Sequence, residues 1–210
     1  GRGYKVIPGP VQKFAEDHNI AVVLPSGENS FYVDQKESHK YYGEFIGREL
    51  VEMTRNIFPL SHKKEDTYLA GFSMGGYGAI RNGLKYHDTF GYIGAISAAL
   101  LTDDLHNWGE GDDLLSSKSF AQSCFGDLNK VIGSDMDPKF LIDDLIANDI
   151  EIPKIFMAVG DNDFLYDENI DYYNYLKSRN VDVEFRCSSG EHTWEFCNDY
   201  IKEFIEWLPL

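Results

Sequence analysis

Residues 67–79 read TYLAGFSMGGYGA, and this stretch decides the fold. Its centre has the form G-x-S-x-G, from Gly71 to Gly75, with Ser73 as the serine. The residues before it suit a short buried strand, and the residues after it suit a helix. A serine on a sharp turn between a strand and a helix presents its hydroxyl outward, so Ser73 is predicted to be a nucleophile.

The turn around the serine also explains its glycines and one nearby amide. Side chains two residues before and two residues after the serine would collide in a strained turn, which favours Gly71 and Gly75. The amino end of the following helix directs its dipole toward the place where negative charge develops in the reaction. The backbone N–H of Met74 is therefore one predicted oxyanion donor.

A serine hydroxyl is a poor nucleophile at neutral pH and needs a neighbouring base. Of the six histidines, His192 lies in the segment SGEHTW at 189–194, between the last predicted strand and the last predicted helix. A base there completes the chain order serine, acid, histidine that accompanies G-x-S-x-G. The other five fit solvated loops and helix ends. They are His18, His39, His62, His87 and His106.

The acid that orients the histidine is expected in the loop GDNDFL at 160–165, directly after the apolar run KIFMAV. Asp163 is preferred, because the loop must leave the strand before it turns a carboxylate back toward the imidazole. The apolar pair that follows can anchor that turn, and Asp161 stays as the alternative. Asp167 and Glu168 fit the first turn of the next helix, where carboxylates complement the dipole.

Short apolar runs alternate with amphipathic stretches along the chain, which is typical of a mostly parallel sheet flanked by helices. The sequence therefore predicts a single α/β domain over residues 1–210, with an irregular helical cap inserted at about 101–152. The predicted strands are 20–24 (IAVVL), 67–70, 92–96, 154–159 and 181–186. The predicted helices are 41–57, 76–85, 169–179 and 193–207.

Aromatic residues in and near the predicted cap are candidate walls of a substrate pocket. They are Trp108, Phe120 and Phe125 in the cap, and Phe31 after the first predicted strand. Packing of the cap against the rest of the domain explains the same side chains equally well.

Composition argues against several other classes of protein. The formal net charge is −16, and so acidic a chain lacks the basic surface that nucleic acids or anionic lipids require. No apolar run is long enough to span a bilayer. Cys124, Cys187 and Cys197 show no paired spacing, so we expect reduced thiols, no metal site and a cytoplasmic protein.

Four motifs in order resemble the esterase D family, which holds S-formylglutathione hydrolases, feruloyl and acetylxylan esterases, and small bacterial esterases of the tributyrin type. They are PSGENSFY at 25–32, GFSMGGYGA at 71–79, GDNDFLY at 160–166 and GEHTWEF at 190–196. The resemblance runs from about Val11 to Trp207. Carried over onto these motifs, it implies an α/β-hydrolase fold with Ser73 as nucleophile, Asp163 as acid and His192 as base.

The start of the chain departs from the family pattern. Members of the family begin with two or three further strands, and a His-Gly turn after one of them supplies the second oxyanion N–H. The segment GRGYKVIPGP at 1–10 has no such pattern. We therefore expect that the N-terminal strands are missing from this sequence and that the native protein carries roughly forty or more additional residues, which leaves secretion open.

Together these features predict a serine carboxylesterase that cleaves short-chain acyl esters, for example of carbohydrates or phenols, through an acyl-enzyme. We expect no cofactor and a small-molecule ester as partner, with homo-oligomer formation left open. Two alternatives stay in view. One is an S-formylglutathione hydrolase, other thioesterase or acyltransferase on the same triad. The other is a non-catalytic binding module, if the N-terminal oxyanion segment is absent.

Overall fold

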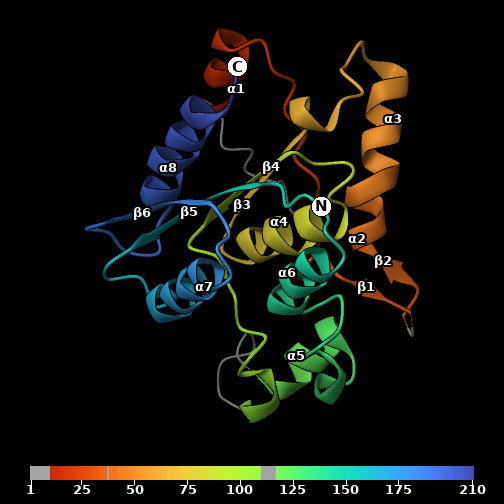
Figure 1. Ribbon diagram of the computed structural model, residues 1–210, viewed down its shortest axis with the longest axis vertical. Helices are drawn as coiled ribbons and strands as arrows, with labels where there is room; N and C mark the ends of the chain where they lie inside the picture. The colour runs from red at the N-terminus through yellow and green to blue at the C-terminus, as the bar shows by residue number, and fades with distance from the viewer. Residues whose placement is uncertain (1–9, 37, 110–116) are drawn as a thin grey trace, which may run out of the picture.

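A four-stranded parallel sheet forms the centre of the structure (Figure 1). The computed structural model describes residues 10–36, 38–109 and 117–210, so the segment 1–9 of the N-terminal prediction lies outside it. The strands are β3 (Tyr68–Phe72), β4 (Tyr92–Ile96), β5 (Lys154–Gly160) and β6 (Val183–Ser188). They lie in the order β3-β4-β5-β6, and each neighbouring pair is parallel.

Helices cover both faces of this sheet (Figure 1). One face carries α4 (Met74–Lys85), α6 (Pro138–Ala147) and α7 (Tyr166–Ser178). The other carries α8 (Trp194–Trp207), against which α1 (Pro10–Asp17) packs. The remaining elements before the sheet are β1 (Asp34–Gln35), β2 (Lys40–Tyr41), α2 (Tyr42–Glu44), a π-helical segment (Phe45–Glu49), α3 (Leu50–Ile57) and a 3₁₀ turn (Lys64–Asp66).

Alternate residues of the central strands face opposite layers, because successive side chains of a strand point to opposite sides. Ile93 and Ala95 of β4 join the buried cluster beneath α4, α6 and α7, whereas Ile96 joins the cluster beneath α8. In β5, Met157 joins the first of these clusters and Phe156 joins the second. Burial on both faces explains why the run KIFMAV shows no alternation of polar and apolar residues.

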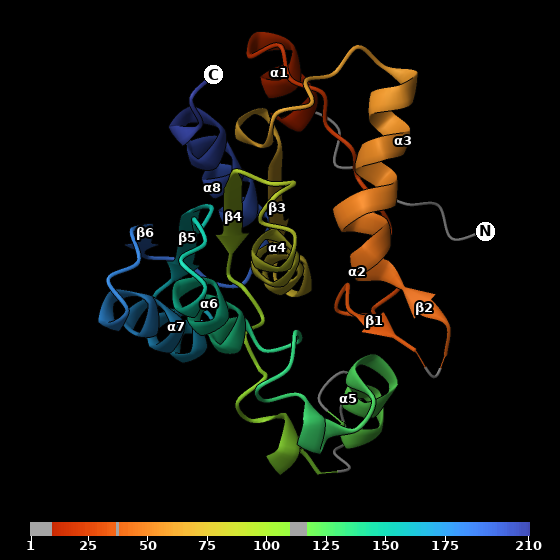
Figure 2. The same cartoon turned by 45° about the vertical axis from the view of Figure 1, so that its right-hand side comes forward.

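The predicted strand 67–70 and the predicted helix 76–85 correspond to β3 and α4, on either side of the G-x-S-x-G turn. The predicted strand 92–96 coincides with β4, and the helix expected at 41–57 runs from Tyr42 to Ile57 through the π-helical segment. On that helix Ile46 is buried, whereas Met53 and Ile57 are 49% and 64% exposed. α3 lies to the side of α4 rather than on the sheet (Figure 2).

The predicted strand at 20–24 is wrong. Residues 20–27 have no regular secondary structure, and Val22, Val23 and Leu24 are exposed. An apolar run becomes a strand only where a neighbour supplies hydrogen-bond partners for its backbone. In the part of the chain that the structure describes, β3 is an edge strand and no strand pairs with its outer side.

The connection between β4 and β5 holds the segment expected to form a cap at 101–152. Among its described residues it contains, in chain order, a 3₁₀ turn at Leu105–Asn107, α5 (Lys118–Phe125), a 3₁₀ turn at Leu128–Lys130 and α6. α5 lies away from the sheet, whereas α6 packs on α4 (Figure 2). Residues 110–116 lie outside the described residues. The segment is therefore irregular and helical, as predicted, and its role as a cap stays a prediction.

Candidate active site

Ser73 alone connects β3 to α4, since the strand ends at Phe72 and the helix begins at Met74. Its backbone has φ 57° and ψ −119°, a conformation that side-chain-bearing residues seldom adopt. Hydrogen bonds hold the turn in place: the Ser73 carbonyl accepts the N–H groups of Gly76 at 2.9 Å and Tyr77 at 3.1 Å. The strained turn expected from G-x-S-x-G is present.

Gly71 and Gly75 differ in what a side chain would meet. A Cβ on Gly71 would overlap the carbonyl group of Gly75, which supports the steric reason for glycine at the first position. Apart from its chain neighbours and the backbone of its own helix, a Cβ on Gly75 would meet no atom of the described residues within 4 Å. The expectation that a collision requires glycine at the second position is therefore wrong.

The structure brings Ser73, His192 and Asp163 together at the carboxyl edge of the sheet. Ser73 Oγ lies 2.9 Å from His192 Nε2. His192 Nδ1 lies 3.0 Å from Asp163 Oδ1 and 2.9 Å from Asp163 Oδ2. The three residues follow β3, β6 and β5, whose parallel ladders place the ends of these strands at one edge.

Burial differs along this chain of hydrogen bonds. The Asp163 side chain is fully buried and that of His192 is 17% exposed. The Asp163 carboxylate also accepts the N–H of Leu165 at 2.9 Å. A carboxylate held in this way accepts the Nδ1 proton of a neutral imidazole and leaves the Nε2 lone pair directed at the serine hydroxyl.

Asp161, the alternative acid, has a different position. Its Oδ1 accepts the N–H of Gly190 at 3.1 Å, and the N–H of Asn162 donates to the Gly190 carbonyl at 2.9 Å. A Cβ on Gly160 would overlap that same carbonyl, so the acid loop and the histidine loop are in close contact. The Asp161 carboxylate therefore joins the acid loop to the backbone of Gly190, which lies two residues before His192 in the histidine loop.

Two aromatic rings contact the imidazole of His192. Phe72 stacks on it with ring centroids 4.5 Å apart and planes 26° apart. Phe164 lies at 4.5 Å and 47°, and Trp194 lies 5.2 Å from Phe72. Sequence reasoning missed these contacts, because it assigned the apolar pair after Asp163 to anchoring the loop. Leu165 is buried as expected, whereas Phe164 is 73% exposed.

The first turn of α7 continues from the acid loop and is itself acidic. Asp167 and Glu168 lie in that turn, as predicted from the helix dipole. Burial, together with the charges of Asp167 and Asp104, raises the pKa of Glu168. This carboxyl group therefore keeps its proton to higher pH than an exposed glutamate.

The predicted pocket walls lie among core aromatic residues. Phe31 contacts Phe125 at 5.0 Å, Phe120 at 6.2 Å and Tyr77 of α4 at 5.5 Å, measured between ring centroids. Phe31 and Phe125 are buried, and the partly buried Trp108 packs on the same cluster. Their assignment to a substrate pocket stays a prediction, and burial favours the packing role for Phe31 and Phe125.

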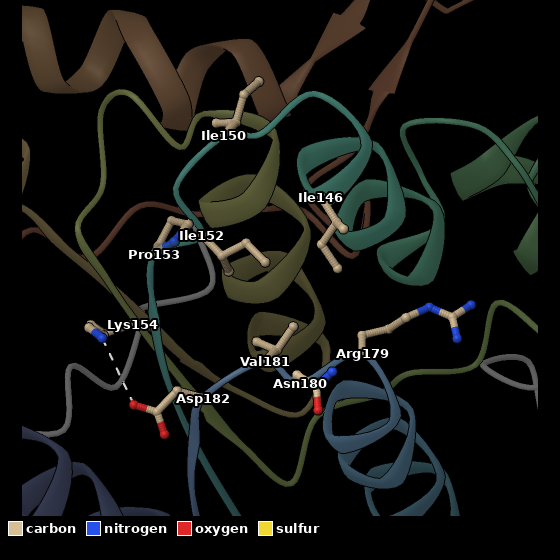
Figure 3. A pocket seen from close by; sticks show the side chains of 9 residues that line it. All are labelled: Ile146, Ile150, Ile152, Pro153, Lys154, Arg179, Asn180, Val181 and Asp182. Carbon is tan, nitrogen blue, oxygen red and sulfur yellow. Dashed lines mark ion pairs between the residues drawn. The ribbon is translucent and has the colours of Figure 1, made fainter.

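A pocket of about 260 Å³ is lined by residues that include Lys154, Val181 and Asp182 (Figure 3). These residues lie where β5 and β6 begin, whereas Ser73 follows the end of β3. Lys154, the first residue of β5, and Asp182, just before β6, form an ion pair of 3.9 Å at its wall.

In the described ranges, no three His, Cys, Asp or Glu side chains are grouped so as to hold a metal ion. None of the described helices is both long and apolar enough to cross a membrane.

Comparison with known proteins shows similarity over nearly the whole chain. Residues 10–206 match the Esterase family model ("Putative esterase"). An acetyl esterase from Caldicellulosiruptor saccharolyticus is 46% identical over 192 residues, which cover 91% of this chain and 72% of that protein.

Two solved structures from Staphylococcus aureus have similar folds. FphF, a fluorophosphonate-binding serine hydrolase, is 34% identical with a TM-score of 0.82, covering 94% of this chain and 74% of its own. The S-formylglutathione hydrolase FrmB is 33% identical with a TM-score of 0.80, covering 94% and 75%. Because the family match takes in all four motifs and both ends of the sheet, the chain belongs to the Esterase family and is a serine carboxylesterase with an α/β-hydrolase fold.

Proposed function

We propose that Ser73, His192 and Asp163 are the catalytic triad of this esterase and that its substrates are small esters with short acyl groups. The observation that supports this most is the unbroken line of hydrogen-bond distances, 2.9 Å from Ser73 Oγ to His192 Nε2 and 2.9 Å from Nδ1 to Asp163. A serine, a base and an orienting carboxylate are the side chains that acyl transfer of this kind uses.

The proposed reaction proceeds in two halves. His192 Nε2 accepts the hydroxyl proton as Ser73 Oγ attacks the carbonyl carbon of the ester, and the Met74 N–H donates to the oxyanion. The imidazolium then protonates the leaving alcohol, and an acyl-enzyme forms on Ser73. In the second half His192 deprotonates water, which attacks the acyl carbon and releases the carboxylic acid. Asp163 remains ionised throughout and holds the imidazole tautomer.

The relatives support a short acyl group. The protein from Caldicellulosiruptor saccharolyticus is an acetyl esterase, and FrmB is an S-formylglutathione hydrolase. Acetyl and formyl are the two smallest acyl groups, and in both cases the acyl group is transferred to serine as the alcohol or thiol leaves and is then released by water. We place acetyl esters first, because the acetyl esterase is the more similar in sequence, at 46% against 33% identity. Hydrolysis of S-formylglutathione is the second candidate.

The test combines a substrate panel with a serine variant. The wild-type protein is expected to hydrolyse p-nitrophenyl acetate with a higher kcat/KM than the butyrate or octanoate, and faster than it hydrolyses S-formylglutathione. Ser73→Ala is expected to remain folded, to lose labelling by a fluorophosphonate and to lose at least about 10³-fold in kcat. Ser178→Ala, at an exposed serine at the end of α7, is the matched control and should keep full activity.

Three results would contradict this function. Ester hydrolysis that survives in Ser73→Ala would exclude the triad. A wild-type protein that neither hydrolyses any ester of the panel nor reacts with the fluorophosphonate would favour a binding module. Acyl transfer to an added alcohol that exceeds hydrolysis would favour an acyltransferase.

A further inference from the structure

We infer that Asn169 is a positioning residue that holds the acid loop and the nucleophile turn at a set distance, an inference that presupposes the triad proposed above. Asn169 lies in α7 and is fully buried. A buried side chain that served only to fill space would be apolar, because a buried amide is costly unless its hydrogen bonds are satisfied. Its partners therefore indicate what it does.

The side-chain amide of Asn169 makes three hydrogen bonds, all to backbone groups. Its Oδ1 accepts the N–H of Ala98 at 3.1 Å. Its Nδ2 donates to the carbonyl of Ala98 at 2.9 Å and to the carbonyl of Leu165 at 2.7 Å. An asparagine amide has two N–H donors, so these bonds use both of them and the acceptor as well.

On one side the amide holds the segment that fixes Ser73. Ala98 lies in the turn after β4, and the N–H of Ala99, the next residue, donates to the Ser73 carbonyl at 2.9 Å. The Ser73 N–H donates to the Ile96 carbonyl at 3.0 Å. Residues 96–99 therefore form hydrogen bonds with both the N–H and the carbonyl of Ser73. Asn169 bonds to Ala98 within that segment.

On the other side the amide holds the loop that fixes Asp163. The Leu165 carbonyl accepts from Asn169, and the Leu165 N–H donates to Asp163 Oδ1 at 2.9 Å. The same Asp163 oxygen lies 3.0 Å from His192 Nδ1. One buried amide thus links the support of the nucleophile to the support of the acid. Leu165 alone lies between it and Asp163, whereas Ala98 and Ala99 lie between it and Ser73.

The expected consequence of removing this link is a change in kcat rather than in substrate binding. None of the three bonds reaches a group that would contact substrate, but each sets the place of a triad residue. A small misplacement of catalytic groups by a distant substitution can cost about 10²-fold in rate. A loss of kcat with little change in KM is the signature of an interaction that matters in the transition state.

The experiment compares variants of one helix. Asn169→Ala removes all three bonds, and Asn169→Ser is a milder variant of similar polarity that does not reach Ala98. Leu176→Ala is the matched control, because Leu176 is also fully buried in α7 but lies near the carboxyl end of that helix (Tyr166–Ser178), whereas Asn169 lies in its first turns next to the acid loop. Steady-state kinetics with p-nitrophenyl acetate and the rate of fluorophosphonate labelling are measured at a temperature where every variant is folded, as judged by its thermal unfolding curve.

Both Asn169 variants are expected to lower kcat and the labelling rate about 10- to 100-fold, with KM changed less than about two-fold. Leu176→Ala is expected to lower Tm at least as much as Asn169→Ser, yet to keep kcat within about two-fold. If Asn169→Ala does not fold, the kcat and the labelling rate of Asn169→Ser alone test the inference.

Two results would overturn the inference. One is an equal loss of kcat in Leu176→Ala and the Asn169 variants at equal loss of Tm, which would mean that only helix stability matters. The other is wild-type kcat in folded Asn169→Ser. Failure of the triad itself would look different, because Ser73→Ala would then keep its activity whatever the Asn169 variants do.

Discussion

The ring of Phe164 lies 4.5 Å from the imidazole of His192, centroid to centroid, although 73% of Phe164 is exposed. An exposed aromatic residue contributes little to the core, so its contact with the imidazole is the main interaction that this position makes. Phe72 contacts the same imidazole at 4.5 Å, so two rings restrict its rotation.

Replacing Phe164 by alanine is expected to lower kcat/KM about two- to ten-fold, which corresponds to an aromatic pair worth about 0.5–1.5 kcal/mol. Tm should change little, because exposed side chains contribute little to stability. Ester hydrolysis and thermal unfolding measure the two effects. Phe140→Ala, at an exposed phenylalanine of α6, is the control. Unchanged kcat/KM in Phe164→Ala would show that the contact has no role.

Asp163→Asn should lower kcat by about 10³- to 10⁴-fold, because asparagine supports the wrong imidazole tautomer. Asp161→Asn should cost less than about ten-fold, since an asparagine oxygen can still accept the N–H of Gly190. Steady-state kinetics of the two folded variants compare the effects directly. The opposite order of effects would transfer the role of the acid to Asp161.

Alanine at the two glycines of the turn should have unequal effects. Gly71→Ala forces a Cβ against the carbonyl of Gly75, so we expect loss of activity and a lower Tm. Gly75→Ala adds a Cβ that meets no described atom and lies in helix α4, where alanine is favoured over glycine by about 0.5–1 kcal/mol. It should fold at least as stably as the wild type. Equal destabilisation of the two variants, measured by thermal unfolding, would refute the geometry of the turn.

An ionic cluster around the buried Arg81 of α4 makes stability depend on pH. The fully buried Arg81 lies 2.7 Å from Asp135 and 3.7 Å from Asp34, and Lys85 lies 2.6 Å from Asp135. Burial acts to raise the pKa of Asp135, but the charges of Arg81 and Lys85 outweigh it and hold that pKa below its ordinary value. Because the folded pKa is lowered, this carboxylate stabilises the fold above its unfolded pKa of about 3.9 and loses that effect as pH falls through the folded pKa.

Asp135→Asn is therefore expected to lower Tm at neutral pH, and the difference from the wild type should shrink as pH falls below about 4. Thermal unfolding between about pH 3 and pH 8 measures this. Asp199→Asn, at an exposed residue of α8, is the control, and its Tm should change with pH in the same way as that of the wild type. A difference between wild type and Asp135→Asn that stays constant across this range would contradict the assigned sign.

The strands of the sheet and the helices that pack on it could be predicted because the sequence patterns that indicate them are local. A run such as KIFMAV or a periodic helix carries its own pattern, and the G-x-S-x-G turn is defined by backbone sterics within five residues. The run IAVVL at 20–24 carries an equally strong local pattern, yet it is not a strand. A strand depends on a hydrogen-bonding partner that is remote in sequence, and no local pattern shows whether that partner is present.

The same division applies to the site. Sequence alone indicated Ser73 and His192 and narrowed the acid to two residues of one loop, because motif and chain order are properties of the sequence. Asp161 and Asp163 stand two positions apart, so only the folded chain places one beside Gly190 and the other beside the imidazole. The ring of Phe164 against His192 and the amide of Asn169 between two loops were likewise invisible beforehand. Such contacts join segments far apart in the chain, and tertiary packing decides which of them meet.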